Sequence, residues 1–179
     1  LGGGSRYNHF RMIDGVQIYG GFAGTESAVI ERTNFGLGGA NETILSADLN
    51  GDDVVTGSGT TLNISNNGEN CYHVFLHPNG MLPVLTNTAL LDGFTIRGGN
   101  ANGAGANEGG GGGICNVQCS PTLNNLIIIN NAAGGGSGIA LEGNTVTGGN
   151  NHTKLSNSII KDNYAEVAGA GISMNDCSP

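Results

Sequence analysis

The chain has 179 residues, of which 34 are glycine and 4 are proline, and its formal net charge is −8. With only 6 lysine and arginine residues, it lacks the basic clusters that nucleic-acid phosphates require, which argues against a nucleic-acid partner. No apolar run is long enough to span a bilayer as a helix, and the glycines do not follow the three-residue repeat of collagen. The length fits one domain covering residues 1–179.

The first 59 residues predict short strands separated by irregular excursions. Apolar residues alternate around Val16 and Ile18, and again in Thr43–Leu49, with the two-residue period of a strand. Between these strands Ala23–Ala40 is a polar excursion, in which Ser27–Arg32 is long enough for one helical turn. We therefore expect N-terminal coils that are less regular than the later ones.

A polar cluster follows the second of these strands. Asp48, Asn50, Asp52 and Asp53 provide closely spaced oxygen ligands, a pattern that suits Ca²⁺. The pattern of an EF-hand loop is incomplete, because Gly59 stands where a bidentate glutamate would fall. The same residue types suit a turn between strands, so the cluster predicts either a turn or a calcium site.

Two strand candidates come next. Thr60–Asn67 aligns with a later segment at a spacing of 32 positions, which predicts Ile64 beneath Ile96. Tyr72–His77 alternates, so His73 and His77 are predicted on one face of a strand and exposed to solvent. With no Glu or Cys nearby in sequence, the two histidines are assigned no metal or acid–base role.

Three segments of similar sequence then follow one another at a spacing of 32 positions. These segments are Leu91–Ala101, Leu123–Ala133 and Leu155–Ala165. Their apolar residues coincide at three positions: Leu91, Leu123 and Leu155; Ile96, Ile128 and Ile160; and Ala101, Ala133 and Ala165. An internal period of this length is the sequence signature of a solenoid. The pattern therefore predicts stacked β coils, clearest over residues 60–179, with the isoleucines in one interior column.

Glycine and asparagine recur at two positions of each repeat. The first set is Gly93, Asn125 and Asn157, and the second is Gly99, Asn131 and Asn163. Both residue types tolerate a left-handed backbone at low cost, so each set predicts a sharp corner between strands. Stacked asparagines are also expected to hydrogen-bond to one another.

Two runs, Gly98–Gly113 and Gly143–Thr153, are too polar or too rich in glycine for a buried strand and are predicted to leave the coils as loops. Because they fall at corresponding points of successive coils, we expect the long loops on one side. Ile114, Ile139 and Ile172 each follow a glycine run and are predicted to begin strands.

The cysteines do not fix a disulfide state. Cys115 and Cys119 flank a predicted corner, where they are placed either to pair or to fill small core positions as single thiols; Cys71 and Cys177 complete the set. The chain ends in Cys177-Ser178-Pro179, and the matching Cys119-Ser120-Pro121 leads into a predicted strand. We therefore expect the sequence to be an internal fragment of a longer chain.

Several motifs occur in an order that resembles a known group of proteins. They are Gly20-Gly21-Phe22, Ser46-Ala47-Asp48, Tyr72-His73-Val74 and Leu91-Asp92-Gly93, followed by the Gly-Gly-Gly-Ile and Ser-Pro-Thr-Leu repeats. Together they resemble bacterial secreted right-handed parallel β-helix proteins related to the polymorphic outer membrane protein repeats. The resemblance implies a right-handed single-stranded parallel β-helix from a secreted, cell-surface or outer-membrane protein, with no established reaction.

Two functions are expected from this pattern. The first is a non-enzymatic scaffold or passenger that contacts an extracellular glycan or a host or neighbouring surface, with no catalytic residue and no cofactor other than Ca²⁺. The second is a fragment of a carbohydrate-active β-helix enzyme, either a polysaccharide lyase or a glycoside hydrolase. An enzyme must bring chemically useful side chains together in one cleft, whereas a scaffold leaves them dispersed. The side chains in question are Asp48, Asp52, Asp53, His73, Arg97 and Lys161.

Overall fold

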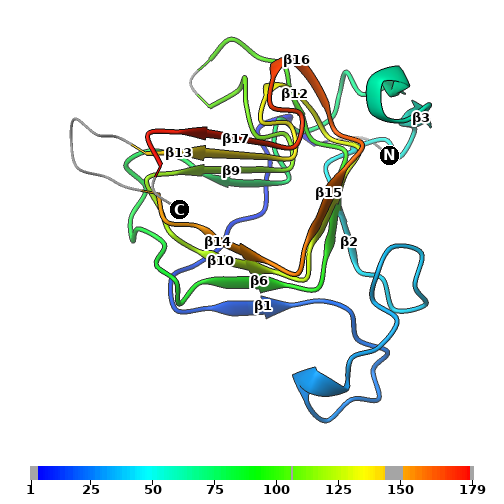
Figure 1. The fold of residues 1–179 in the computed structure, drawn as a ribbon, viewed down its shortest axis with the longest axis vertical. Helices are drawn as coiled ribbons and strands as arrows, with labels where there is room; N and C mark the ends of the chain where they lie inside the picture. Colours follow the sequence, from blue (N-terminus) through cyan, green and yellow to red (C-terminus); the bar gives the residue numbers. More distant parts are fainter. Residues whose placement is uncertain (1–3, 106, 144–150, 178–179) are drawn as a thin grey trace.

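The computed structural model describes residues 4–105, 107–143 and 151–177. Over these residues the chain is all-β, as predicted, with four parallel sheets and one antiparallel hairpin (Figure 1). Two short 3-10 turns, η1 (Val29–Glu31) and η2 (Gly59–Thr61), complete the regular structure. The turn expected within Ser27–Arg32 is therefore confirmed as η1.

Each parallel sheet is assembled from strands that are far apart in the sequence. Sheet 1 has the order β1 (Gln17–Tyr19), β6 (Leu90–Asp92), β10 (Thr122–Asn124), β14 (Lys154–Ser156). Sheet 2 has the order β2 (Ile44–Ser46), β7 (Thr95–Arg97), β11 (Ile127–Ile129), β15 (Ile159–Lys161). Sheet 3 has the order β8 (Asn100–Ala101), β12 (Ala132–Gly135), β16 (Tyr164–Ala168). Sheet 4 has the order β5 (Phe75–His77), β9 (Ile114–Val117), β13 (Ile139–Glu142), β17 (Ile172–Asn175).

The 32-residue spacing is the register between the strands of sheets 1 to 3 from β6 onward. Leu123 pairs with Leu91 and Leu155, Ile128 with Ile96 and Ile160, and Ala133 with Ala101 and Ala165. The leucines and isoleucines at the centre of each column are fully buried, since Leu91, Ile96, Leu123 and Ile128 are all 0% exposed. Ile114, Ile139 and Ile172 begin their strands, as predicted, and the structure aligns them in sheet 4. The aligned isoleucines and leucines thus form the main core.

The segment Thr60–Asn67 does not form the preceding repeat, and this prediction is wrong. Its strand β4 (Asn63–Ser65) pairs in antiparallel fashion with β3 (Val54–Thr56) and lies outside the parallel sheets. Leu45, on β2, occupies the place expected for Ile64 and pairs with Ile96. The regular repeats therefore begin with β6 and not at residue 60.

The two corners of each repeat differ in their backbone. Gly93, Asn125 and Asn157 have φ values of 83°, 51° and 47°, which confirms the first predicted left-handed corner. At the second corner the left-handed residues are Gly98, Asn130 and Asp162, one position before the predicted set. The predicted set serves a different purpose, because Asn131 and Asn163 are buried and hydrogen-bond to the neighbouring repeats.

This buried asparagine ladder has a regular pattern. The backbone N–H of Gly99 donates to Oδ1 of Asn131 at 3.0 Å, and the N–H of Asn131 donates to Oδ1 of Asn163 at 3.0 Å. Glycine stands at the first position for a steric reason, since a Cβ on Gly99 would lie 1.7 Å from the carbonyl oxygen of Gly112. The bonds between Asn131 and Asn163 confirm the expected contact between stacked asparagines.

The long excursions leave the sheets at different corners, so the expectation of loops on one side is wrong. Residues 20–43 connect sheet 1 to sheet 2, whereas residues 102–113 connect sheet 3 to sheet 4 (Figure 1). The ends of the glycine-rich run Gly98–Gly113 are also buried, because β8 and Gly111–Gly113 belong to the packed stack. Most of the second run, residues 144–150, lies outside the described residues.

All four cysteines are free thiols. Cys71, Cys119 and Cys177 pack in or against the main core, whereas Cys115 packs with Val117 and Ala140 in a smaller cluster. Burial raises the pKa of the Cys115 and Cys119 thiols to about 12. Of the two alternatives, the structure favours single thiols that fill small core positions.

Candidate functional site

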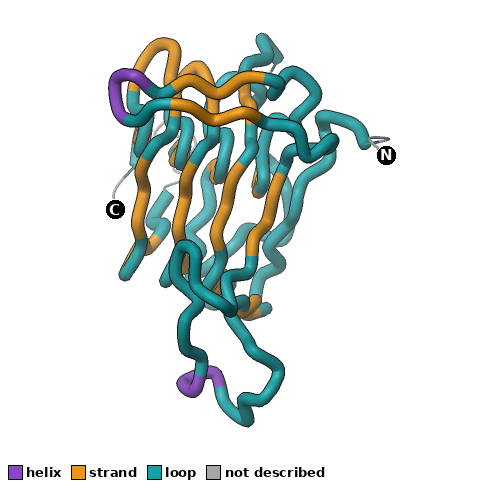
Figure 2. Tube along the Cα trace, turned by 90° about the vertical axis from the view of Figure 1, so that its right-hand side faces the viewer, coloured by secondary structure: helices purple, strands orange, loops and turns teal. Residues whose placement is uncertain are grey.

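The β3–β4 hairpin borders two hollows with polar residues in their lining, to which it contributes Ile64 and Val55. It runs crosswise to the strands of sheet 2, beyond their ends and beside the second corner of the repeats, as Figure 2 shows. Beyond β3 its η2 turn reaches the last repeat, where the N–H of Gly59 donates to Oδ1 of Asp162 at 3.3 Å. At its other end the carbonyl of Asn67 accepts a 2.7 Å bond from Nδ2 of Asn100. The hairpin is thus tied to two repeats that are far apart in the sequence.

Three carboxylates gather where the chain enters and leaves this hairpin. One oxygen each from Asp48, Asp52 and Glu69 lies within 4.8 Å of the other two. Carboxylate oxygens are the ligands that hard cations such as Ca²⁺ prefer. Asp48 and Asp52 were predicted from the sequence, but Glu69 was not. Glu69 is distant in sequence, and only the hairpin brings it back beside Asp48.

Asp53, another predicted ligand, is not part of this cluster. Its carboxylate accepts bonds of 2.9 and 3.1 Å from Nδ2 of Asn70. The role of the fourth predicted ligand, Asn50, stays a prediction. Asp48 accepts the backbone N–H groups of Gly51, Asp52 and Asp53, at 2.6, 3.3 and 3.2 Å. The predicted turn is therefore present. It is compatible with a cation bound by the remaining lone pairs of the carboxylates.

The carboxyl group of Asp53, beside this cluster, has a perturbed pKa. Burial raises the pKa of Asp53 to about 6, and the nearby charges of Asp48, Glu69 and Asp52 act in the same direction, against the hydrogen bond from Asn70. Glu69 also has a buried Oε1 atom with no hydrogen-bond partner among the described residues. Closely spaced carboxylates repel one another, and a bound cation relieves this repulsion.

One cleft collects several of the residues expected of an enzyme. Asp48, Asp53 and Arg97 line a cavity of about 310 Å³ together with Asn130. His73 and Lys161 do not reach it, because His73 lines other hollows and Lys161 Nζ lies 3.7 Å from Asp162 on the surface. The convergence expected for an enzyme is therefore partial, with two acids and one cation around one cavity.

The histidines are not exposed, which corrects the prediction made for them. His73 and His77 are each 4% exposed. Nδ1 of His73 lies 2.8 Å from the carbonyl oxygen of Gly111, and Nε2 contacts that of Asn107. Burial lowers the pKa of both imidazoles.

The predicted alternation is also wrong, because the strand covers only Phe75–His77, Val74 packs with Phe75 in the main core, and Leu76 packs against the smaller cluster around Cys115. The glycine-rich run folds back over His73.

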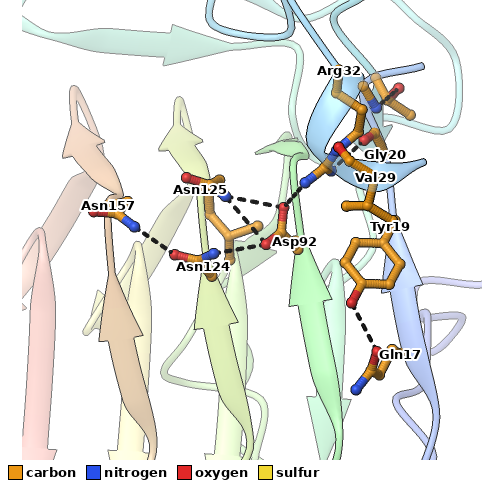
Figure 3. Close-up of polar contacts among 12 residues, drawn as sticks. Gln17, Tyr19, Gly20, Val29, Arg32, Asp92, Asn124, Asn125 and Asn157 are labelled. Carbon is orange, nitrogen blue, oxygen red and sulfur yellow. Dashed lines mark hydrogen bonds and ion pairs between the residues drawn. The ribbon is translucent and has the colours of Figure 1, made fainter. Parts of the chain in front are cut away.

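A second polar network, around Arg32 and Asp92, was not predicted from the sequence. Arg32, on the excursion between sheets 1 and 2, forms a buried ion pair with Asp92 at 2.7 Å and donates to the carbonyl of Gly20 (Figure 3). Asp92 also accepts bonds from the side chains of Asn124 and Asn125. The aromatic rings of Tyr19, Phe22 and Phe35 lie 5.0–5.5 Å from the guanidinium.

This network extends along the stack of repeats. Oδ1 of Asn124 accepts hydrogen bonds from Ser156 and Asn157, so that side chains of three successive repeats are linked (Figure 3). Its polar groups are bonded to one another, which suits a structural clamp better than a reactive centre. The alignment of Asp92, Asn124 and Ser156 at the 32-residue spacing was a readable signal.

Comparisons with protein-family models, with curated proteins and with solved structures return no match. Among the residues that the structure describes, no helix has the length and hydrophobicity needed to cross a membrane.

Proposed function

We propose that this chain is a section of a right-handed single-stranded parallel β-helix and serves as a non-enzymatic scaffold on a bacterial surface or in a secreted protein. The resemblance to the polymorphic outer membrane protein repeats supports this architecture. The supporting observation from the structure is that consecutive strands enter sheets 1, 2, 3 and 4 in turn, and that this order repeats from β6 to β17. Such stacking presents broad, fixed surfaces for contact with extended ligands.

Extracellular glycans are the ligand class that we propose. The surface beside the hairpin carries amides, carboxylates and a tyrosine, which exchange hydrogen bonds with hydroxyl groups. The net charge of −8 disfavours polyanionic ligands. A glycan array probed with the purified chain, with and without Ca²⁺, tests the proposal. Binding to a defined set of glycans is expected, and an array without any signal would refute glycan contact.

We also propose that Asp48, Asp52 and Glu69 hold a calcium ion. The proximity of the three carboxylates supports this, and so does the unpartnered Oε1 of Glu69. Calcium titration followed by calorimetry is expected to give one site, which Glu69→Gln weakens by at least about tenfold. Asp176→Asn is the matched control, because Asp176 lies outside the cluster and its loss leaves the affinity unchanged. Equal affinities for the Glu69 variant and the unaltered chain would refute the site.

The second candidate is a carbohydrate-active enzyme. The specific observation in its favour is the cavity lined by Asp48, Asp53 and Arg97, in which a carboxyl of raised pKa is a potential general acid. An assay for new reducing ends or unsaturated products across polysaccharides decides between the candidates. Activity that disappears in Asp53→Asn would replace the scaffold proposal, whereas no turnover supports the scaffold.

A further inference from the structure

Resting on the proposal of glycan contact, we infer that a groove between the β3–β4 hairpin and sheet 3 binds a neutral saccharide, with Tyr164 as its stacking platform. We call this hollow the Tyr164 groove. Its volume is about 150 Å³. It shares no lining residue with the cavity around Asp48, Asp53 and Arg97. The residues that line the groove are Ile64, Asn67, Asn100, Asn102, Ala132, Ala133, Tyr164 and Glu166.

The floor of the groove follows from the register of sheet 3. Asn100, Ala132 and Tyr164 are paired neighbours on β8, β12 and β16. The small side chain of Ala132, between the two larger ones, leaves a notch in this column. Tyr164 is 46% exposed, so part of its ring is available to a ligand, whereas Asn100 and Ala132 are buried.

The opposite wall is held in place by hydrogen bonds. Ile64 and Asn67 belong to the hairpin, and the carbonyl of Asn67 accepts the 2.7 Å bond from Asn100. The guanidinium of Arg6 donates to the carbonyl of Asn100 at 2.9 Å and to Oδ1 of Asn102 at 2.7 Å. A groove fixed in this way loses little conformational entropy when it binds a ligand.

The chemistry of the lining selects an uncharged polyol. Apart from the Tyr164 phenol, Glu166 is the one ionisable side chain in the lining, and no hydrogen bond or ion pair to its carboxylate occurs within the described part of the chain. A free carboxylate accepts bonds from hydroxyl groups and repels anions. Asparagine amides both donate and accept, as hydroxyl groups require.

The exposed ring supplies the apolar half of the recognition. A tyrosine ring offers a flat apolar face and a polar tip, which match the C–H face and the hydroxyl edge of a pyranose. An acidic sugar such as a uronate would place its carboxylate beside Glu166 without a cation among the lining residues. The groove therefore favours neutral over acidic saccharides.

Titration calorimetry on the whole 179-residue chain tests the inference. The probes are the neutral tetrasaccharides cellotetraose, maltotetraose and mannotetraose, with tetragalacturonate as the acidic comparison. At least one neutral probe is expected to bind, and tetragalacturonate more weakly than that probe. Tyr164→Ala is expected to weaken binding by about tenfold, and Tyr164→Phe by less than about threefold, because the ring face is retained.

Val167→Ser is the matched control, since Val167 lies on the same strand, is 85% exposed and does not line the groove. Its affinity is expected to equal that of the unaltered chain, and circular dichroism checks that every variant is folded. Equal binding by Tyr164→Ala, tighter binding of tetragalacturonate, or no binding of any neutral probe would overturn the groove assignment.

The same variants separate this inference from the proposed function. If the glycan array gives signals that Tyr164→Ala leaves unchanged, glycan contact stands and the groove assignment falls. If the array gives no signal with the unaltered chain, both fall.

Discussion

The repeats from β6 onward differ from the segment before them in how their strands are spaced along the sequence. From Leu90 to Asn175 the chain places strands in sheets 1 to 3 at a fixed spacing, so that like residues stack on like. Before Leu90 the strands β1 and β2 join sheets 1 and 2, and β5 joins sheet 4, but long excursions separate these strands. A strand therefore joins a parallel stack through its local pattern and its burial, and a regular sequence spacing is not required.

The largest effect is expected from removing a side chain in the regular core. Ile128→Ala deletes a fully buried side chain between two others and is expected to destabilise the fold by about 4 kcal/mol in urea denaturation. Ile64→Ala, in the hairpin, is expected to cost about 1 kcal/mol, because Ile64 is half-buried. Equal losses would contradict the assignment of Ile64 to a position outside the core column.

The next effect concerns the clamp that joins the irregular part to the repeats. Arg32→Met leaves the Asp92 carboxylate buried without its cation and is expected to cost about 3 kcal/mol. Adding Asp92→Asn removes the unpaired charge, so the double variant is expected to regain most of that loss. If the double variant were no more stable than Arg32→Met, Arg32 would stabilise the fold through its packing and not through its charge.

A smaller effect distinguishes the two neighbouring asparagines of the second corner. Asn131→Gly removes a buried amide that bonds to two repeats and is expected to cost about 2 kcal/mol. Asn130→Gly is expected to change the stability by less than about 0.5 kcal/mol, because glycine accepts the φ of 56° at this position. Thermal denaturation of the pair checks which residue forms the turn and which forms the ladder. The reverse order of stability would contradict the assignment.

The smallest effect is a dependence of stability on pH that comes from the irregular part. Because the pKa of Asp53 is raised to about 6 from its ordinary 3.8, the folded chain binds more protons than the unfolded chain between these values. The contribution of Asp53 to stability is therefore full at low pH and declines as pH rises through this window. Asp53→Asn is expected to flatten that decline in denaturation curves from pH 4 to 7, with Asp14→Asn as an exposed control. An unchanged profile would show that Asp53 has no raised pKa.

Much of the fold could be predicted because stacked strands place similar residues at a regular spacing in the sequence. The columns of Leu123, Ile128 and Ala133, and the strand that starts at Ile139, were predicted at residue level. The errors lie where an interaction between distant segments decides the outcome. Thr60–Asn67 carried the right spacing, yet β3 offered it a nearer partner across the turn at Gly57 and Gly59.

The candidate site was less predictable than the fold. Asp48 and Asp52 were identified, but Glu69 joins them only through the hairpin, and Asp53 turns to Asn70. The Tyr164 groove has no sequence signature, since its lining comes from residues 64, 67, 100, 102, 132, 133, 164 and 166.

The sequence alone determined the all-β class, the 32-residue register and the first left-handed corner, because each depends on residues whose spacing is fixed by the repeat. The tertiary structure alone decided the burial of His73, the pairing of Arg32 with Asp92, and the position of the hairpin beside the second corner of the repeats. These features depend on where the excursions fold back. An excursion has no period, and its position is set by the contacts that it finds on the finished stack.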